Sequence, residues 1–181
     1  MVFISAGHNP KGQRDPGAVS GNLAEADLTE EFKNILVPIA KGLGLKIVTD
    51  KPDEKLADYL KRIKPGNGSV VIEFHFDSAI NKSATGATAI VGSDADRFDK
   101  LFAKEIVDAT AQTLEIKNRG VINEAESHRG RLGLMREQGI VSLLEIGFIS
   151  NPDDVKKYQQ KKIELATRLA SIIKKYEDLI S

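Results

Sequence analysis

The sequence of 181 residues contains no cysteine, and this absence limits the chemistry open to the chain. Disulfide bonds and zinc sites with thiolate ligands are excluded. Any bound metal ion must therefore be held by histidine, aspartate or glutamate. The chain has three histidines, at positions 8, 75 and 128.

The sequence also lacks an excess of charge of either sign. Its 26 basic residues balance 26 acidic ones, and no long run of basic residues stands out. A nucleic acid or another polyanion therefore has no electrostatic support as a partner. No apolar stretch approaches the roughly 18 residues needed to cross a bilayer, so we expect no membrane-spanning segment.

The N-terminus lacks the basic segment and the long apolar segment of a secretory signal peptide. Three explanations stay open at this point. The chain acts in the cytoplasm, it leaves the cell by another route, or it is a piece of a longer protein.

What is present fits one globular domain spanning residues 1–181. The hydrophobic fraction of 41% and the charged fraction of 29% are ordinary for such a domain, and the length allows a proper core. Predicted strands alternate with predicted helices, and no repeat or linker interrupts them. The pattern predicts an α/β domain with a twisted, mostly parallel (mixed) central sheet flanked by helices.

Short apolar runs predict the strands, and apolar residues spaced three or four apart predict the helices. The expected strands are 2–4, 45–49, 69–76, 86–91 and 140–146. Helices are expected over about 25–42, 56–63, 95–114 and 161–179, with a further helix opening at 153–154. Residues 118–130 are expected to form a loop, and residues 132–136 a short turn or strand.

Titratable side chains stand at the ends of three of these apolar strands. His8 follows the first strand, His75 ends the third, and Glu145 ends the last strong one. If these strands are parallel neighbours, the three side chains meet at one end of the sheet, where open α/β sheets bind ligands. Glu25, at the start of the helix after the first loop, can reach the same place.

Two histidines and a carboxylate make the donor set of an open zinc site. Three protein ligands leave a fourth position for water, whose pKa falls to about 7 on the metal. A further carboxylate beside that water could act first as a general base and then as an acid. Glu25 and Glu145 are the candidates for these two roles, and their spacing does not decide between them.

Each candidate also has a purely structural interpretation. His8 could be a hydrogen-bonded turn residue. Glu25 could serve only as a negative charge at a helix N-terminus. Glu145 could be a buried partner of Arg119 or Arg136.

Two further residues draw attention. Glu73 alternates with His75 along one strand, so it should share that face and either pair with a cation or support a metal ligand from behind. His128 lies among polar residues and is expected to be a loop residue rather than a substrate contact. A retaining glycosidase built on two carboxylates would leave the histidines without a role.

Short motifs spread along nearly the whole chain carry a family resemblance. They are Gly7-His8, Asp15-Pro-Gly-Ala18, Glu25-Ala-Asp-Leu28, Phe74-His75-Phe-Asp77, Asn118-Arg-Gly-Val121, Leu132-Gly-Leu-Met-Arg136 and Leu144-Glu145-Ile-Gly-Phe-Ile-Ser-Asn151. In this order they resemble the catalytic domain of the zinc-dependent, type-3 N-acetylmuramoyl-L-alanine amidases of bacterial autolysins and phage endolysins. The last motif is the most specific.

The resemblance implies that His8, Glu25 and His75 bind Zn²⁺ and that Glu145 is the catalytic carboxylate. It also implies that the substrate is peptidoglycan, cut at the amide between N-acetylmuramic acid and the L-alanine of the stem peptide, so that the enzyme lyses bacterial cell walls. Two alternatives on the same fold are a non-catalytic peptidoglycan-binding module and a metal-dependent endopeptidase of the stem peptide.

The sequence departs from the family pattern in several places. Asp77 stands where the family commonly has Asn, and Ser5-Ala6 replaces an Asp-Pro-like pair without loss of a proposed ligand. The regulatory insertion that some members carry after the 86–91 strand is missing, which implies an open groove.

No wall-binding module lies within residues 1–181. Together with the missing signal peptide, this favours a phage-type endolysin that is made in the cytoplasm, acts on the wall after release and has lost a second domain. We expect a monomer.

Overall fold

The computed structural model describes residues 1–8, 15–51, 54–127 and 130–180. In chain order its strands and helices are β1 Val2–Ala6, β2 Val19–Ser20, β3 Leu23–Ala24, α1 Glu25–Gly42, β4 Ile47–Thr49, α2 Leu56–Arg62, β5 Val70–Asp77, β6 Ala87–Val91, α3 Arg97–Leu114, β7 Asn118–Asn123, the 3-10 helices η1 Glu124–Glu126 and η2 Gly133–Arg136, β8 Ile140–Phe148 and α4 Pro152–Ile180.

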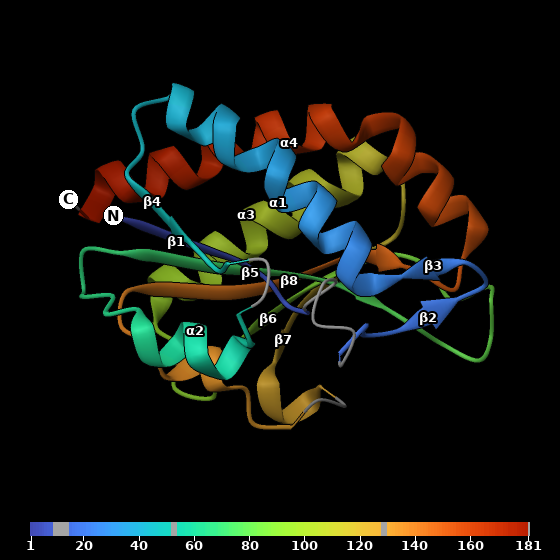
Figure 1. The fold of residues 1–181 in the computed structure, drawn as a ribbon, viewed down its shortest axis with the longest axis horizontal. Helices are drawn as coiled ribbons and strands as arrows, with labels where there is room; N and C mark the ends of the chain where they lie inside the picture. Colours follow the sequence, from blue (N-terminus) through green and yellow to red (C-terminus); the bar gives the residue numbers. More distant parts are fainter. Residues whose placement is uncertain (9–14, 52–53, 128–129, 181) are drawn as a thin grey trace.

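A six-stranded sheet with the order β4-β1-β5-β8-β6-β7 forms the centre of the molecule (Figure 1). Its neighbouring strands are parallel except for β6 and β8, which pair antiparallel. The prediction of a mixed, mostly parallel α/β sheet is therefore confirmed. Because β1, β5 and β8 are adjacent and parallel, their carboxyl ends lie together at one edge of the sheet.

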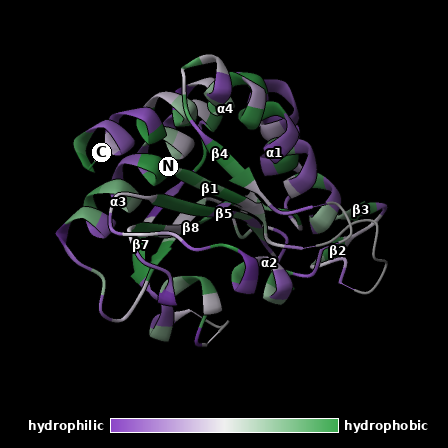
Figure 2. Ribbon diagram, turned by 60° about the vertical axis from the view of Figure 1, so that its left-hand side comes forward, coloured by the Kyte–Doolittle hydropathy of each residue, from purple (hydrophilic) through white to green (hydrophobic). Residues whose placement is uncertain are grey.

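Helices cover both faces of this sheet. In Figure 1, α1, α3 and α4 lie above it, and α2 lies below it. Alternate residues of the strands point to opposite faces of the sheet and belong to two hydrophobic cores. Val70 and Ile72 pack in the core beneath α1 and α4, and Val71 packs in the core beneath α2 and η2. Figure 2 shows the consequence, with strongly hydrophobic strands inside and hydrophilic residues on the outer sides of the helices.

Aromatic side chains hold the larger core together. The ring of Phe32 on α1 meets Phe74 on β5 edge to face at 4.9 Å, and Tyr158 on α4 meets Phe76 in the same way at 5.0 Å. The Tyr158 hydroxyl donates a hydrogen bond to the carbonyl of Leu28. Each fully buried large side chain stabilises the fold by about 1.5–3 kcal/mol, so these rings anchor α1 and α4 to the sheet.

Two expectations about local structure are wrong, and a third is decided between its alternatives. Residues 118–123 form the edge strand β7 rather than a loop. Residues 133–136, expected to be a short turn or strand, form a short turn of 3-10 helix. The final helix is continuous from Pro152 to Ile180, so the two predicted helical segments are one. His128 and its neighbour Arg129 lie outside the described residues.

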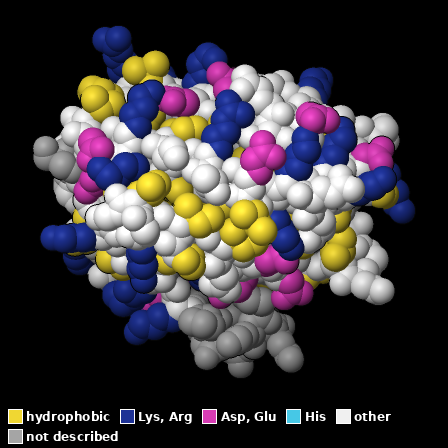
Figure 3. Space-filling model, turned by 90° about the horizontal axis from the view of Figure 1, so that it is seen from above, with side chains coloured by type: hydrophobic (Ala, Val, Ile, Leu, Met, Phe, Trp, Pro, Cys, Tyr) yellow, Lys and Arg dark blue, Asp and Glu magenta, His cyan; other side chains and the backbone are white. Residues whose placement is uncertain are grey.

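None of the helices in the described part of the chain is both long and apolar enough to cross a membrane. Figure 3 shows the molecule from above, where basic and acidic side chains are interspersed over the surface. This distribution agrees with the formal net charge of zero. It leaves that face without a large patch of positive or negative electrostatic potential.

Candidate active site

Polar side chains occupy the α2 face of the sheet at the carboxyl ends of its central strands. Val71 on β5 and Leu143 on β8 still belong to the apolar core on this face. Two residues further along each strand, the same orientation places Glu73 and Glu145. His75 comes next on β5 and is the register partner of Glu145. On this face of the sheet, the side chains of β5 and β8 therefore change from apolar to polar over two residues.

Glu25 reaches this place from the start of α1. Its backbone N–H donates to Ala18, and its Oε2 accepts from the Ala18 N–H at 2.9 Å. The other carboxylate oxygen, Oε1, accepts from the Phe76 N–H at 3.1 Å. Bonds to the loop before β2 and to the end of β5 thus fix the side chain, which is 2% exposed.

His8, Glu25 and His75 form one compact group. The Glu25 Oε1 lies 2.8 Å from His75 Nδ1, and its Oε2 lies 3.3 Å from His8 Nε2. The two imidazole rings are nearly perpendicular, with centroids 4.9 Å apart. One potential ligand atom from each residue lies within 4.8 Å of the others. The structure therefore brings together the three residues that the family resemblance implies as metal ligands.

Two glycines make room for this group. A Cβ on Gly7 would lie only 1.9 Å from the Nε2 atom of His75. Gly17 has a φ of +66°, a region that side-chain-bearing residues rarely adopt, and a Cβ there would lie 2.6 Å from both Glu25 and His8. The glycines of the Gly7-His8 and Asp15–Ala18 motifs are therefore needed for close approach to the ring and carboxylate groups.

The electrostatics of the group favour positive charge between the three side chains. Burial alone would raise the pKa of Glu25, but hydrogen bonds and charge from His75 and His8 hold that pKa well below its usual range. Burial opposes charge on the rings, yet hydrogen bonds to carboxylates raise the pKa of His75 to about 9 and also raise the pKa of His8. A divalent cation could supply this positive charge in place of the protons.

The residues fit a zinc ion. Zinc in proteins takes imidazole and carboxylate ligands, and an open site needs three of them. The buried group offers two rings and one carboxylate, and glycines leave space beside each. The far nitrogen of each ring also faces a carboxylate: His8 Nδ1 lies 2.9 Å from Asp15, and His75 Nε2 lies 2.9 Å from Glu73. Such carboxylate partners are usual behind metal-binding histidines.

Glu145 links this group to a polar pocket. On one side its register partner is His75, and on the other it is Thr88 of β6. Its side chain is 3% exposed and lines a pocket of about 460 Å³. Asp77, Thr88, Ile90, Lys117, Asn118, Arg119, Ile122, Glu126 and Ser127 line the same pocket. Glu145 therefore stands between the group that could hold a metal and the space that could hold a substrate.

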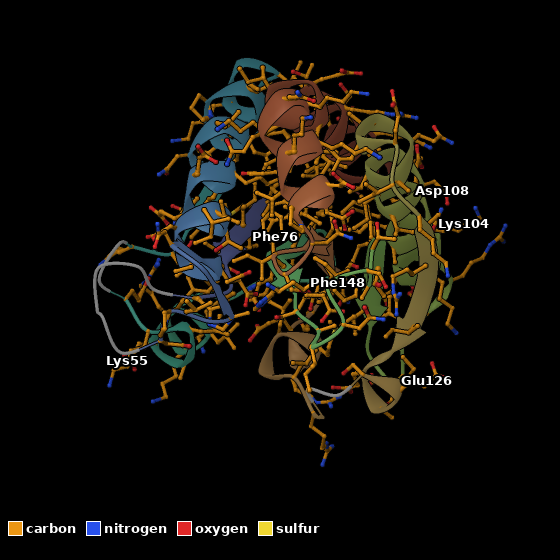
Figure 4. All side chains as sticks on the ribbon, turned by 90° about the vertical axis from the view of Figure 1, so that its right-hand side faces the viewer. Lys55, Phe76, Lys104, Asp108, Glu126 and Phe148 are labelled. Carbon is orange, nitrogen blue, oxygen red and sulfur yellow. The ribbon has the colours of Figure 1, made fainter. Side chains whose placement is uncertain are left out.

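Most residues that line the pocket belong to β6, β7 and η1, and most of them were not predicted from the sequence. Glu126 is the last residue of η1, and Figure 4 shows it at the lower edge of the molecule, well away from the interior Phe76. Arg119 projects over the ring of Phe148 at 5.1 Å. The Asn118–Val121 motif is part of the family resemblance, but the sequence predicts a loop there. The position of residues 118–123 on a strand beside Glu145 could therefore not be predicted.

One alternative for Glu145 finds no support. Arg136, a proposed structural partner, instead binds Glu124 at 2.6 Å and approaches Asp94. Glu124 also accepts from the N–H groups of Ser93 and Leu132. Arg136 therefore joins the segments around η1 and η2 rather than neutralising Glu145.

The chain matches a known family model over residues 2–175, described as N-acetylmuramoyl-L-alanine amidase. It matches no curated protein sequence.

Several solved structures are similar over almost the whole chain. A Neisseria meningitidis protein, provisionally assigned as an N-acetylmuramoyl-L-alanine amidase, shares 31% identity with a TM-score of 0.78, covering 95% of this chain and 92% of its own. The N-acetylmuramoyl-L-alanine amidase of Clostridium difficile shares 22% identity with a TM-score of 0.79, covering 98% and 96%. The CwlD amidase of Clostridioides difficile, solved with the GerS lipoprotein, shares 19% identity with a TM-score of 0.81, covering 98% of both chains. The last two likenesses concern the fold.

Proposed function

This chain belongs to the N-acetylmuramoyl-L-alanine amidase family, and from that premise we propose that it is a zinc-dependent hydrolase of peptidoglycan. The bond cut is the amide between N-acetylmuramic acid and the L-alanine of the stem peptide. The observation that carries the proposal is the convergence of His8, Glu25 and His75 beside Glu145. A binding module would have no need for a buried group of this composition next to an open pocket.

In this proposal His8 Nε2, one Glu25 oxygen and His75 Nδ1 hold the zinc ion, because these atoms face one another. Bound there, zinc would polarise the scissile carbonyl, lower the pKa of water and stabilise negative charge that develops on oxygen. Glu145 accepts the proton of the attacking water and passes it to the departing amine, so that the L-alanine nitrogen leaves as a neutral amine.

The pocket beside Glu145 receives the stem peptide. Its walls carry both charge signs, with Lys117 and Arg119 facing the same space as Asp77 and Glu126. Such a mixed lining suits a peptide that offers amide groups as well as carboxylates.

Metal removal tests the zinc requirement. The purified protein should contain one zinc ion per chain, since the described residues offer one group of three converging ligands. Treatment with a strong chelator should abolish release of new amino termini from purified peptidoglycan, and stoichiometric Zn²⁺ should restore it. Undiminished activity in protein shown to be metal-free would refute the zinc dependence.

A further inference from the structure

A second buried carboxylate lies directly behind the proposed metal site. Glu73 of β5 precedes His75 by two residues and is 2% exposed, surrounded by the sheet and the core beneath α2. A carboxylate in such a place is costly unless hydrogen bonds compensate for its lost hydration. Its presence therefore calls for a role that a smaller apolar residue could not fill.

Both oxygens of Glu73 are engaged. Oε1 lies 2.9 Å from His75 Nε2, and Oε2 accepts a hydrogen bond of 3.0 Å from the Ser5 hydroxyl. Ser5 is the register partner of Glu73 on the neighbouring strand β1. The hydroxyl thus fixes the carboxylate, and the carboxylate in turn faces the ring. All three side chains sit on adjacent strands of the same sheet, which is a rigid support.

The two nitrogens of the His75 ring face different carboxylates. Nδ1 lies 2.8 Å from Glu25, within the group that could hold the metal, and Nε2 faces Glu73 on the opposite side of the ring. Gly7 lies so close to this ring that a Cβ there would overlap Nε2 at 1.9 Å. The ring is therefore held in one orientation from behind as well as from the front.

We propose that Glu73 is a positioning residue for the metal site. It accepts the hydrogen of His75 Nε2, which fixes the tautomer that leaves the Nδ1 lone pair free for the metal. Ser5 keeps the accepting carboxylate in place. A negatively charged acceptor at this position orients the ring and strengthens its nitrogen as a ligand. This inference rests on the proposed zinc site and assigns to it a residue outside the three ligands and Glu145.

The other histidine provides an internal comparison. Asp15 faces His8 Nδ1 at 2.9 Å, but its side chain is 64% exposed, whereas the Glu73 side chain is 3% exposed. Solvent screens an exposed charge and competes for its hydrogen bonds. Loss of the Glu73 carboxylate should therefore weaken metal binding more than loss of the Asp15 carboxylate.

Zinc affinity measured by competition with a chromophoric chelator tests the proposal. The full chain is compared with Glu73→Gln, Glu73→Ala and Asp15→Asn. Ser142→Ala is the matched control, because Ser142 is a fully buried polar residue on β8 that bonds to Ile90. Substitutions behind metal ligands typically cost about 10–100-fold in metal affinity. We expect a loss of about 10-fold for Glu73→Gln, a larger loss for Glu73→Ala, a smaller one for Asp15→Asn and none for Ser142→Ala.

The NMR signal of the His75 ring N–H distinguishes a residue that orients the ring from one that only stabilises the fold. In the zinc-loaded protein, the His75 Nε2 proton should give a ring N–H resonance protected from solvent exchange. Glu73→Ala should lose this protection, and Ser142→Ala should keep it. If Glu73→Ala does not fold, Glu73→Gln decides alone, since it keeps the shape of the side chain and removes only its charge.

Zinc binding by Glu73→Gln within twofold of the unsubstituted protein would overturn the proposed role of Glu73. The same titration tests the zinc site separately. If the unsubstituted protein binds no zinc, the proposed function fails. If it binds one zinc ion and the Glu73 variants bind equally well, only the inference about Glu73 fails.

Discussion

At the scale of single residues, space matters as much as donor chemistry. The ring of His75 occupies the volume where any side chain larger than glycine at position 7 would lie. Gly7 shows no unusual φ angle, so its requirement comes from this close approach rather than from backbone conformation. A metal site of this kind depends on small residues beside its ligands as well as on the ligands.

Gly7→Ala tests this requirement for space. The new Cβ would overlap the His75 ring, so the ring must move away from Glu25. We expect overpacking to cost about 1–3 kcal/mol of unfolding free energy, together with a marked loss of zinc affinity. Gly66→Ala is the control, because a Cβ there meets no atom within 4 Å. Zinc titration and urea unfolding check both variants, and unchanged zinc affinity in Gly7→Ala would contradict the argument.

Glu145→Gln separates chemistry from metal binding. Glu145 lies beside His75 but is not one of the three converging residues. The variant should therefore keep one zinc ion per chain while its kcat falls about 10²–10⁴-fold, the usual contribution of a general acid–base group. Metal analysis and turnover of a soluble muropeptide are measured on the same sample. A zinc-loaded variant that works at the normal rate would exclude Glu145 as the proton carrier.

At the scale of elements, the buried central strands could be predicted from the sequence more accurately than the exposed edge strand. Strands β1, β5 and β8 are flanked by other strands and each begins with a run of apolar residues, so the sequence located them well. Strand β7 lies at the sheet edge, pairs on one side only and contains Asn118, Arg119 and Gly120. Such a half-exposed strand carries little periodicity, and its pairing depends on β6, which is distant in sequence.

The same contrast applies to the candidate site. Polar residues after apolar strands were visible in the sequence, and their convergence followed from the assumption of parallel neighbours. The contacts of Asp15 with His8 and of Ser5 with Glu73 depend on strand register and loop path, which no local pattern encodes. The continuity of α4 was missed because residues 159–164 contribute no buried side chain between Tyr158 and Leu165, so the apolar pattern that predicts a helix is interrupted there.

A surface ion pair ties α2 to the rest of the domain and should give a pH-dependent contribution to stability. Arg62 donates to both oxygens of Glu54 at 2.6 Å and also to the carbonyl of Thr49 on β4. Hydrogen bonding to Arg62 lowers the pKa of Glu54. A depressed carboxyl pKa stabilises the fold above the unfolded value of about 4.3, and this gain is lost as the pH falls through the folded value.

Glu54→Gln should therefore lower the unfolding free energy at pH 7 by up to about 1 kcal/mol. The difference from the unsubstituted protein should shrink toward zero at about pH 3. Asp58→Asn, which alters a loose 3.7 Å pair with Lys61 on the same helix, should have little effect at either pH. Urea unfolding at the two pH values decides, and a penalty that persists undiminished at the lower pH would rule out the ionic origin.

At the scale of the whole molecule, the proposed zinc ion joins segments that are remote in sequence. His8 follows β1, Glu25 begins α1, and His75 belongs to β5. A ligand that binds only the folded chain stabilises it by mass action. The metal site is thus expected to support the arrangement of α1 against the sheet as well as the reaction.

Zinc should therefore raise the melting temperature. Free zinc at about 100 times its Kd adds about 2.7 kcal/mol, which corresponds to roughly 5–10 °C for a domain of this length. Glu145→Gln should show the same zinc-dependent rise, whereas Glu25→Gln should lose most of it. Thermal unfolding with and without zinc measures the shift, and an equal rise in Glu25→Gln would place the metal elsewhere.

The central claim concerns the bond that is cut, and mass spectrometry of digested peptidoglycan tests it most directly. Zinc-loaded protein should release intact stem peptides with a free L-alanine amino terminus and leave glycan strands bearing unsubstituted N-acetylmuramic acid carboxyl groups. Glu145→Gln with its zinc bound should release few or none. Peptides shortened within the stem, with L-alanine still joined to N-acetylmuramic acid, would contradict the account and identify an endopeptidase.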